Sequence, residues 1–80
     1  MPETRKMAVV LHEDRHCDPS VFLFEDPDEA VAFAKARIRE FDRFNCLDET
    51  PVAGWLYNAT IEDVGGIRVT LEDVKEADHA

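Results

Sequence analysis

Basic residues are scarce in this sequence, and their scarcity limits the partners that it can bind directly. Nine Lys and Arg face eighteen Asp and Glu, which gives the 80-residue chain a formal net charge of −9. Affinity for DNA or RNA comes largely from Lys and Arg that neutralise phosphates, so direct binding of nucleic acid is disfavoured. The opposite inference is that a compact anion is drawn to a basic protein surface.

Long apolar runs and cysteines are also few. The start of the chain leads only into the short apolar run 8–11, and no segment approaches the roughly 20 residues that span a bilayer. We therefore expect no signal peptide, no membrane segment and a cytoplasmic location. Cys17 and Cys46 fit incidental thiols of a reduced cytosolic protein, although a disulfide between them stays open at this point.

The sequence does contain enough apolar residues for one folded domain. With 45% hydrophobic residues in 80 positions it is too apolar for a disordered acidic tail, and we expect a single domain over 1–80. A core of this size leaves little room for a deep pocket, since small-molecule sites occupy roughly 300–1,000 Å³. An enzyme of this length would need to assemble its site between subunits, so we expect no enzyme and no cofactor.

Four segments have the pattern of strands: the first two are short runs with apolar residues on both faces, and the last two alternate side chains between an apolar and a more polar face. They cover 6–13, 21–25, 54–62 and 67–72, and Val64-Gly65-Gly66 forms a hairpin turn between the last two. One helix lies between the second and the third segment. The pattern predicts an α+β domain in the order β-β-α-β-β, with a four-stranded antiparallel sheet, the helix packed on one face, and a frayed tail at about 75–80.

The helix has the clearest local signal in the chain. Asp26 can cap its start, Pro27 occupies the first position, where no N–H is needed, and Glu29 completes a capping box. The helix is predicted to run from Pro27 to about Phe44. The residues expected to form its buried stripe recur at helical spacing and are Ala30, Phe33, Ala34, Ile38, Phe41 and, at its end, Phe44.

Two strands carry aromatic residues whose orientation decides their role. Trp55 and Tyr57 share a strand face with Ile61, which favours packing in the core over recognition. Phe22 and Phe24 point to one side of the second strand and the aliphatic residues beside them point to the other, so one of these pairs can remain exposed. An exposed aromatic pair would mark a protein contact or a dimer interface.

Twelve of the eighteen acidic residues form six adjacent pairs, most of them at strand ends or in loops. The predicted path of the chain sorts these pairs to two opposite ends of the sheet, roughly 20 Å apart. One end is expected to gather Glu13, Asp14, Asp18, Asp48, Glu49, Glu72 and Asp73, and the other end Glu25, Asp26, Asp28, Glu29, Glu62 and Asp63.

These clusters have two interpretations. Solvation of loop ends accounts for any single pair, and helix capping accounts for Asp26 and Glu29. Clustered carboxylates can also imitate the phosphates of a duplex, which carries about one charge per 1.7 Å, and would then be bound by Arg and Lys of a partner. The candidate contact residues are Glu13, Asp14, Asp48, Glu49, Glu72 and Asp73 at one end, followed by Glu25, Asp28, Glu62 and Asp63 at the other.

Other combinations of reactive side chains are weaker. His12, His16, Cys17 and Asp18 lie within seven residues, but a structural zinc site needs a second ligand pair, and only Cys46 could contribute to it. A nucleophilic pair of Cys17 with a neighbouring histidine lacks an orienting third group. The Gly-Gly turn lacks the Lys and the Ser or Thr of a phosphate loop. We therefore expect no metal site and no catalytic residue.

In size, charge and paired carboxylates the whole chain resembles the small anti-CRISPR proteins of phages and mobile elements that act as DNA mimics against Cascade surveillance complexes. The resemblance implies an inhibitor that occupies the basic surface where a type I Cascade complex engages target DNA, in the cytoplasm of the host. Two alternatives stay open. One is a small interaction module, a monomer or a homodimer formed through an exposed sheet face, and the other is a thiol- or metal-dependent enzyme built on His16, Cys17 and Cys46.

Overall fold

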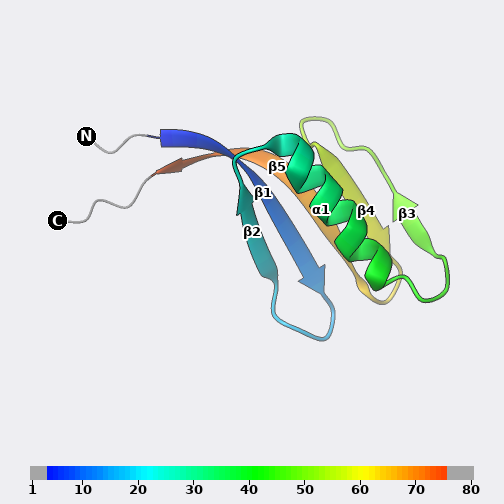
Figure 1. The fold of residues 1–80 in the computed structure, drawn as a ribbon. Coiled ribbons are helices and arrows are strands. Elements are labelled where there is room, and N and C mark those ends of the chain that lie inside the picture. Colours follow the sequence, from blue (N-terminus) through cyan, green and yellow to red (C-terminus); the bar gives the residue numbers. More distant parts are fainter. Residues whose placement is uncertain (1–3, 76–80) are drawn as a thin grey trace.

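The structure is a computed structural model that describes residues 4–75, and it places one helix against one face of a five-stranded sheet (Figure 1). All strand pairs are antiparallel, in the order β2-β1-β5-β4-β3. The α+β class is confirmed, and the prediction of four strands is wrong by one. The elements are β1 (Thr4–Asp14), β2 (Ser20–Phe24), α1 (Pro27–Glu40), β3 (Leu47–Glu49), β4 (Tyr57–Ile61) and β5 (Gly65–Lys75).

The core lies between α1 and the sheet face that α1 covers. Alternate residues of β1, β4 and β5 point to this face, because successive side chains of a strand point to opposite sides. The helical stripe Ala30, Ala34 and Ile38 is buried, as the spacing predicted. The buried apolar residues of the core are Ala8, Val10, Ala30, Ala34, Ile38, Ala59, Ile61, Ile67 and Val69.

The side chains of β2 are divided between the two sheet faces. Phe22 and Phe24 pack against the core and against Phe33, with ring centroids 4.8 and 5.2 Å from that ring. Val21 and Leu23 point to the face opposite α1, which we call the open face, and are 58% and 53% exposed. The exposed pair is therefore the aliphatic one, and the aromatic pair belongs to the core.

The start of α1 agrees with the sequence prediction. The Asp26 carboxylate accepts a hydrogen bond from Asp28 N at 2.9 Å, and Pro27 occupies the first helical position. The end does not agree, because α1 stops at Glu40 and not near Phe44.

The early end of α1 is explained by the turn that follows it. The Asp42 carboxylate accepts hydrogen bonds from Cys46 N at 2.8 Å and from Leu47 N at 3.3 Å. Asn45 adopts a left-handed backbone conformation, with φ of 55°. The chain therefore leaves the helical path, and Phe44, predicted to extend the buried stripe, is 85% exposed.

The sequence predicts a loop at the position where β3 lies. Three residues are too few to show an alternating pattern, and the only apolar residue among them is Leu47, which packs against the core. β3 pairs with β4 from Leu47 opposite Ile61 to Glu49 opposite Ala59. Because of this additional strand the chain crosses the sheet once more before β4, so β4 and β5 run opposite to the predicted directions.

β5 is longer than predicted. It begins at Gly65, so the turn before it comprises residues 62–64, and it pairs with β1 along the full length of both strands. Lys75, expected in the frayed tail, is part of this strand, and the rest of that tail, 76–80, lies outside the described residues. Within residues 4–75 no helix is long and apolar enough to cross a membrane.

His12 is the only polar residue among the buried residues that the structure describes. Its Nδ1 accepts a hydrogen bond from Arg37 Nε at 2.7 Å, and its ring meets Phe41 edge-on with centroids 4.7 Å apart. Because Arg37 donates this bond, Nδ1 carries no proton and the imidazole is neutral. Burial and the Arg37 charge lower the pKa of His12 from 6.5, against a smaller opposing effect of Asp14.

We expect the neutral His12 to make the domain less stable in acid. The unfolded chain takes up this proton near pH 6.5 while the folded chain resists it, so the free energy of unfolding falls as the pH drops below about 6.5. Above about pH 7.5 both states are neutral at this residue, and it contributes no pH dependence. Urea unfolding at about pH 7.5 and about pH 5.5 measures the loss.

Two variants identify the residue responsible. His12→Gln keeps an acceptor for Arg37 but cannot titrate, so it should reduce the loss of stability between the two pH values. His16→Gln removes an exposed histidine and is the matched control, which should leave the loss unchanged. If His12→Gln loses as much unfolding free energy between the two pH values as the unsubstituted domain, another group causes the pH dependence.

Candidate interaction surface

Carboxylates from several segments meet at one end of the sheet, which we call the acidic end. β1, α1 and β4 all end there, and Figure 1 shows the β1–β2 loop, the end of α1 and the β4–β5 turn together in its lower half. Strand pairing places Asp14 opposite Gly65, and hence beside the β4–β5 turn. The acidic end comprises Glu13, Asp14, Asp18, Glu40, Asp42, Glu62 and Asp63.

The loop after β1 is fixed to the β4–β5 turn. Arg15 N donates to Val64 O at 2.8 Å, and the Arg15 guanidinium pairs with the Asp63 carboxylate at 2.8 Å. Asp14 accepts a hydrogen bond from His16 N at 2.8 Å, which shapes the loop. The ion pair is exposed and contributes about 0–1 kcal/mol. Among the described residues, Arg15 is the only cation in an ion pair with the acidic end.

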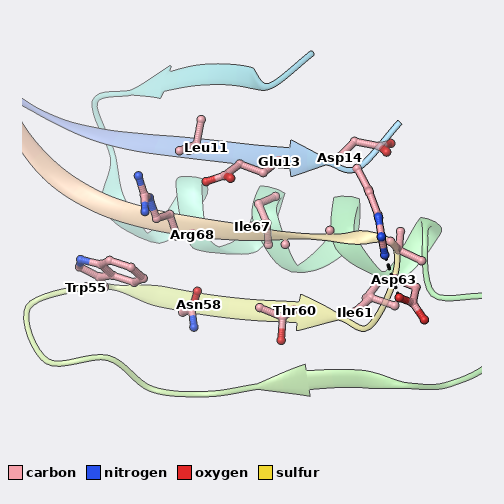
Figure 2. A pocket seen from close by; sticks show the side chains of 14 residues that line it. Leu11, Glu13, Asp14, Trp55, Asn58, Thr60, Ile61, Asp63, Ile67 and Arg68 are labelled. Atoms are coloured by element: carbon pink, nitrogen blue, oxygen red, sulfur yellow. Dashed lines mark hydrogen bonds and ion pairs between the residues drawn. The ribbon is translucent and has the colours of Figure 1, made fainter. Parts of the chain in front are cut away.

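The open face is hollowed at the acidic end, over β1, β5 and β4 (Figure 2). The hollow has a volume of about 460 Å³, and Gly66 leaves it open because it adds no side chain between Glu13 and Thr60. At the other margin Arg68 stacks on Trp55, with its guanidinium carbon 5.1 Å from the ring centroid. The prediction that Trp55 packs in the core is wrong, because this residue precedes β4 and lines the open face.

A second hollow of about 500 Å³ lies at the same end, beside the end of α1. It meets the first hollow at the β4–β5 turn, since Asp14 and Val64 line both. Aromatic and aliphatic side chains line it together with carboxylates. The apolar members are Phe41, Phe44, Ile61 and Val64, the carboxylates are Asp14, Glu40, Asp42 and Glu62, and the remaining lining residues are Arg43, His16 and Cys46.

Asp48 and Glu49 lie on β3, beside the acidic end. Asp48 is exposed and pairs with Thr60, on the same row of the open face as Glu13. Glu49 accepts a hydrogen bond from Tyr57 Oη at 2.6 Å. Burial and this carboxylate raise the pKa of Tyr57 above its usual value of 10.0. Tyr57 packs against the core as predicted, and Glu49 is engaged within the fold.

Two predicted pairs lie at the opposite end from the one expected. Because β4 and β5 run in the reversed directions, Glu62 and Asp63 join the acidic end. Glu72 and Asp73 instead pair with the first residues of β1, at what we call the far end of the sheet. Among residues 4–75, the other acidic residues at the far end are Glu25, Asp26, Asp28 and Glu29.

Several carboxylates of the far end have roles within the fold. Glu25 pairs with Arg5, and Asp26 caps α1. Asp28 and Glu29 lie in the first helical turn, where negative charge is stabilised by the helix dipole. The acidic end is therefore the stronger candidate for a contact surface, because both hollows lie there and fewer of its carboxylates have roles within the fold.

Glu40, Asp42 and Phe44 line the second hollow and were not among the predicted contact residues. Glu40 and Asp42 belong to no adjacent acidic pair, and Phe44 was assigned to the helical stripe. The sequence does contain a signal for the two acids: they follow the helical pattern to its C-terminus, where negative charge opposes the helix dipole. No comparable signal marks Phe44, whose exposure depends on where α1 ends.

The thiols show no catalytic arrangement among the described residues. Cys17 and Cys46 are both free and exposed, so the disulfide is not formed. His16 and Cys46 line the second hollow, but the Cys46 thiol donates to Phe44 O at 3.4 Å. Over residues 4–75 no group of three or more His, Cys, Asp and Glu could hold a metal ion.

The acidic end thus offers exposed carboxylates, a hollow with a stacked Arg–Trp pair and a hollow with an apolar lining. These features suit contact with another molecule through charge and apolar burial. Comparison of the chain with protein-family models, curated proteins and solved structures found no match.

Proposed function

We propose that this domain is a binding protein that occupies the basic nucleic-acid-binding surface of a partner, as an anti-CRISPR DNA mimic does on a Cascade-type complex. The observation that carries the proposal is the convergence of Glu13, Asp14, Glu62 and Asp63 at the acidic end. Arg and Lys side chains that hold phosphates can hold carboxylates by the same charge-assisted hydrogen bonds. The proposed site of action is the cytoplasm of the host cell.

The spacing of carboxylates on the open face supports the same proposal. Glu13 on β1 and Asp48 on β3 share a row that crosses β5 and β4. Three strand spacings separate them, about 14 Å. The phosphate rows that border the major groove of B-DNA are about 12 Å apart. A partner surface that holds both phosphate rows could therefore contact both carboxylates.

Competition with DNA tests this proposal. A Cascade-type complex is mixed with labelled duplex target, and the domain is titrated in while the anisotropy of the DNA is followed. We expect the domain to displace the duplex, and its apparent affinity to fall about tenfold or more between about 50 and about 200 mM salt, because the contacts are ionic. Binding to the complex without any displacement of DNA would contradict mimicry.

A second function is favoured by the apolar strip on the open face. Val21 and Leu23 are exposed on β2, beside Leu11 and Val9 on β1. This strip bears no charge, so a second copy could pack on it without charge repulsion between the apolar side chains in contact. Light scattering on a dilute solution separates the two functions, since a dimer mass supports the interaction module.

A further inference from the structure

Phe44 is held in solvent by a hydrogen-bonded turn. The ring is 85% exposed, although the turn around it is closed by Asp42, whose carboxylate accepts hydrogen bonds from Cys46 N and Leu47 N. The Cys46 thiol also donates to Phe44 O. A turn that fixes an aromatic residue in water gains nothing for the core. Aromatic residues of this kind are typical anchors of protein contacts, because they bury a large area with little loss of conformational entropy.

The Phe44 ring borders the second hollow, whose volume is about 500 Å³. Ile61 is buried and Phe41 and Val64 are half-buried, so these three form its apolar base. Glu40 and Glu62 are exposed at the same hollow, and no ion pair among the described residues engages either of them. Arg43 also lines the hollow, but the four carboxylates in its lining outnumber this one guanidinium, so the hollow combines an apolar base with a margin of net negative charge.

We propose that this hollow binds a basic peptide segment in which an apolar side chain is flanked by Lys or Arg. The apolar side chain enters between Phe44 and the base of the hollow, and the flanking cations meet Glu40 and Glu62. Charge selects this occupant, because a second copy would bring a further net charge of −9 to a margin that is already negative. The inference rests on the proposed function and adds that the basic surface of the partner carries an apolar side chain next to its Lys or Arg residues.

Two short peptides test the inference. One has a central Leu between Arg and Lys residues, and the other has Gly in its place. Both are titrated into the isotope-labelled domain and followed by amide chemical shifts. We expect the Leu peptide to bind about tenfold more tightly, because its Leu side chain leaves water when it enters the hollow. The largest shifts should fall at residues of the second hollow.

A matched pair of variants assigns the apolar contact. Phe44→Ala should weaken the Leu peptide about tenfold and leave the Gly peptide unchanged, with little effect on folding because the ring is exposed. Val21→Ala removes an exposed apolar side chain from the open face and should change neither affinity. Urea unfolding of each variant checks that the fold is kept.

Two results would overturn the inference: equal affinity of the two peptides, or Phe44→Ala without effect on the Leu peptide. Equal affinity would show that cations alone bind at this end, and an unchanged Leu peptide with Phe44→Ala would show that Phe44 does not make the apolar contact. The DNA competition experiment is separate from these titrations. If the domain displaces DNA but shows no preference for the Leu peptide, only the apolar contact is contradicted. If it prefers the Leu peptide but does not displace DNA, the proposed mimicry is contradicted and the peptide site is supported.

Discussion

Replacing Gly65 with alanine should lower the free energy of unfolding by about 3 kcal/mol or more, a large part of the ~3–5 kcal/mol expected for so small a core. Gly65 has a backbone φ of 152°, which residues other than glycine rarely adopt, and it pairs with Asp14 at the end of β1. A Cβ atom there would overlap with the backbone carbonyl oxygen of Glu13. The backbone of β1 or β5 would have to move, and their pairing would be lost at this end.

Gly54→Ala is the matched control for this substitution. Gly54 also has a positive φ, 87°, but a Cβ atom there would meet nothing within 4 Å. We expect a cost of about 1 kcal/mol from the backbone conformation alone. Urea unfolding of both variants measures the difference. Equal losses would mean that backbone conformation, and not the contact with Glu13, makes glycine necessary at position 65.

The Gly65→Ala substitution should also affect the proposed surface, because β1 meets the β4–β5 turn at Gly65. The pairing of Asp14 with Gly65 brings the carboxylates of β1 beside those of the turn. If the Gly65→Ala variant folds with β1 and β5 displaced at this end, Glu13 should lie farther from Glu62. Such a variant should bind a basic partner less tightly. The glycine thus links the sheet geometry to the arrangement of charge.

The parts of the fold that the sequence predicted correctly depend on local signals. The start of α1 follows from Asp26 and Pro27, which act within one turn. The buried stripe follows from the helical period of Ala30, Ala34 and Ile38. Such features need no knowledge of what the element packs against, and the structure confirms them.

The errors come from contacts between segments that lie far apart in the chain. β3 is stabilised by pairing with β4 and by the contact of Leu47 with the core, and neither is visible in a three-residue pattern. Missing one strand reverses every later strand, so the acidic pairs of the last hairpin were assigned to the wrong ends. The exposure of Trp55 has a similar cause, because it depends on stacking with Arg68 across the open face.

The candidate site was accordingly predicted in part. The sequence indicated that carboxylates gather at strand ends, and Glu13 and Asp14 lie where they were expected. It could not combine them with Glu62 and Asp63, because that requires the true direction of β4. The hollows and the exposed Phe44 require the end of α1, which Asp42 sets through two hydrogen bonds along the turn.

Reversing charge at the acidic end should have the largest effect on binding. The double variant Glu13→Lys with Glu62→Lys removes two exposed carboxylates from this end and should weaken a basic partner about 100-fold at low salt, because close interfacial charge pairs contribute several kcal/mol. Neither side chain caps a helix or packs in the core, so the fold should be retained. The DNA competition experiment measures the change.

The control is Glu29→Lys with Glu72→Lys, which places the same changes on exposed residues of the far end. Either double variant raises the net charge from −9 by four units, to −5, so a difference between them reports position and not total charge. We expect the control to lose affinity only a few-fold, and the gap between the variants to narrow as salt screens the charges. If the two variants weaken the partner equally at every salt concentration, only the net charge of the domain matters and the acidic end is not the contact surface.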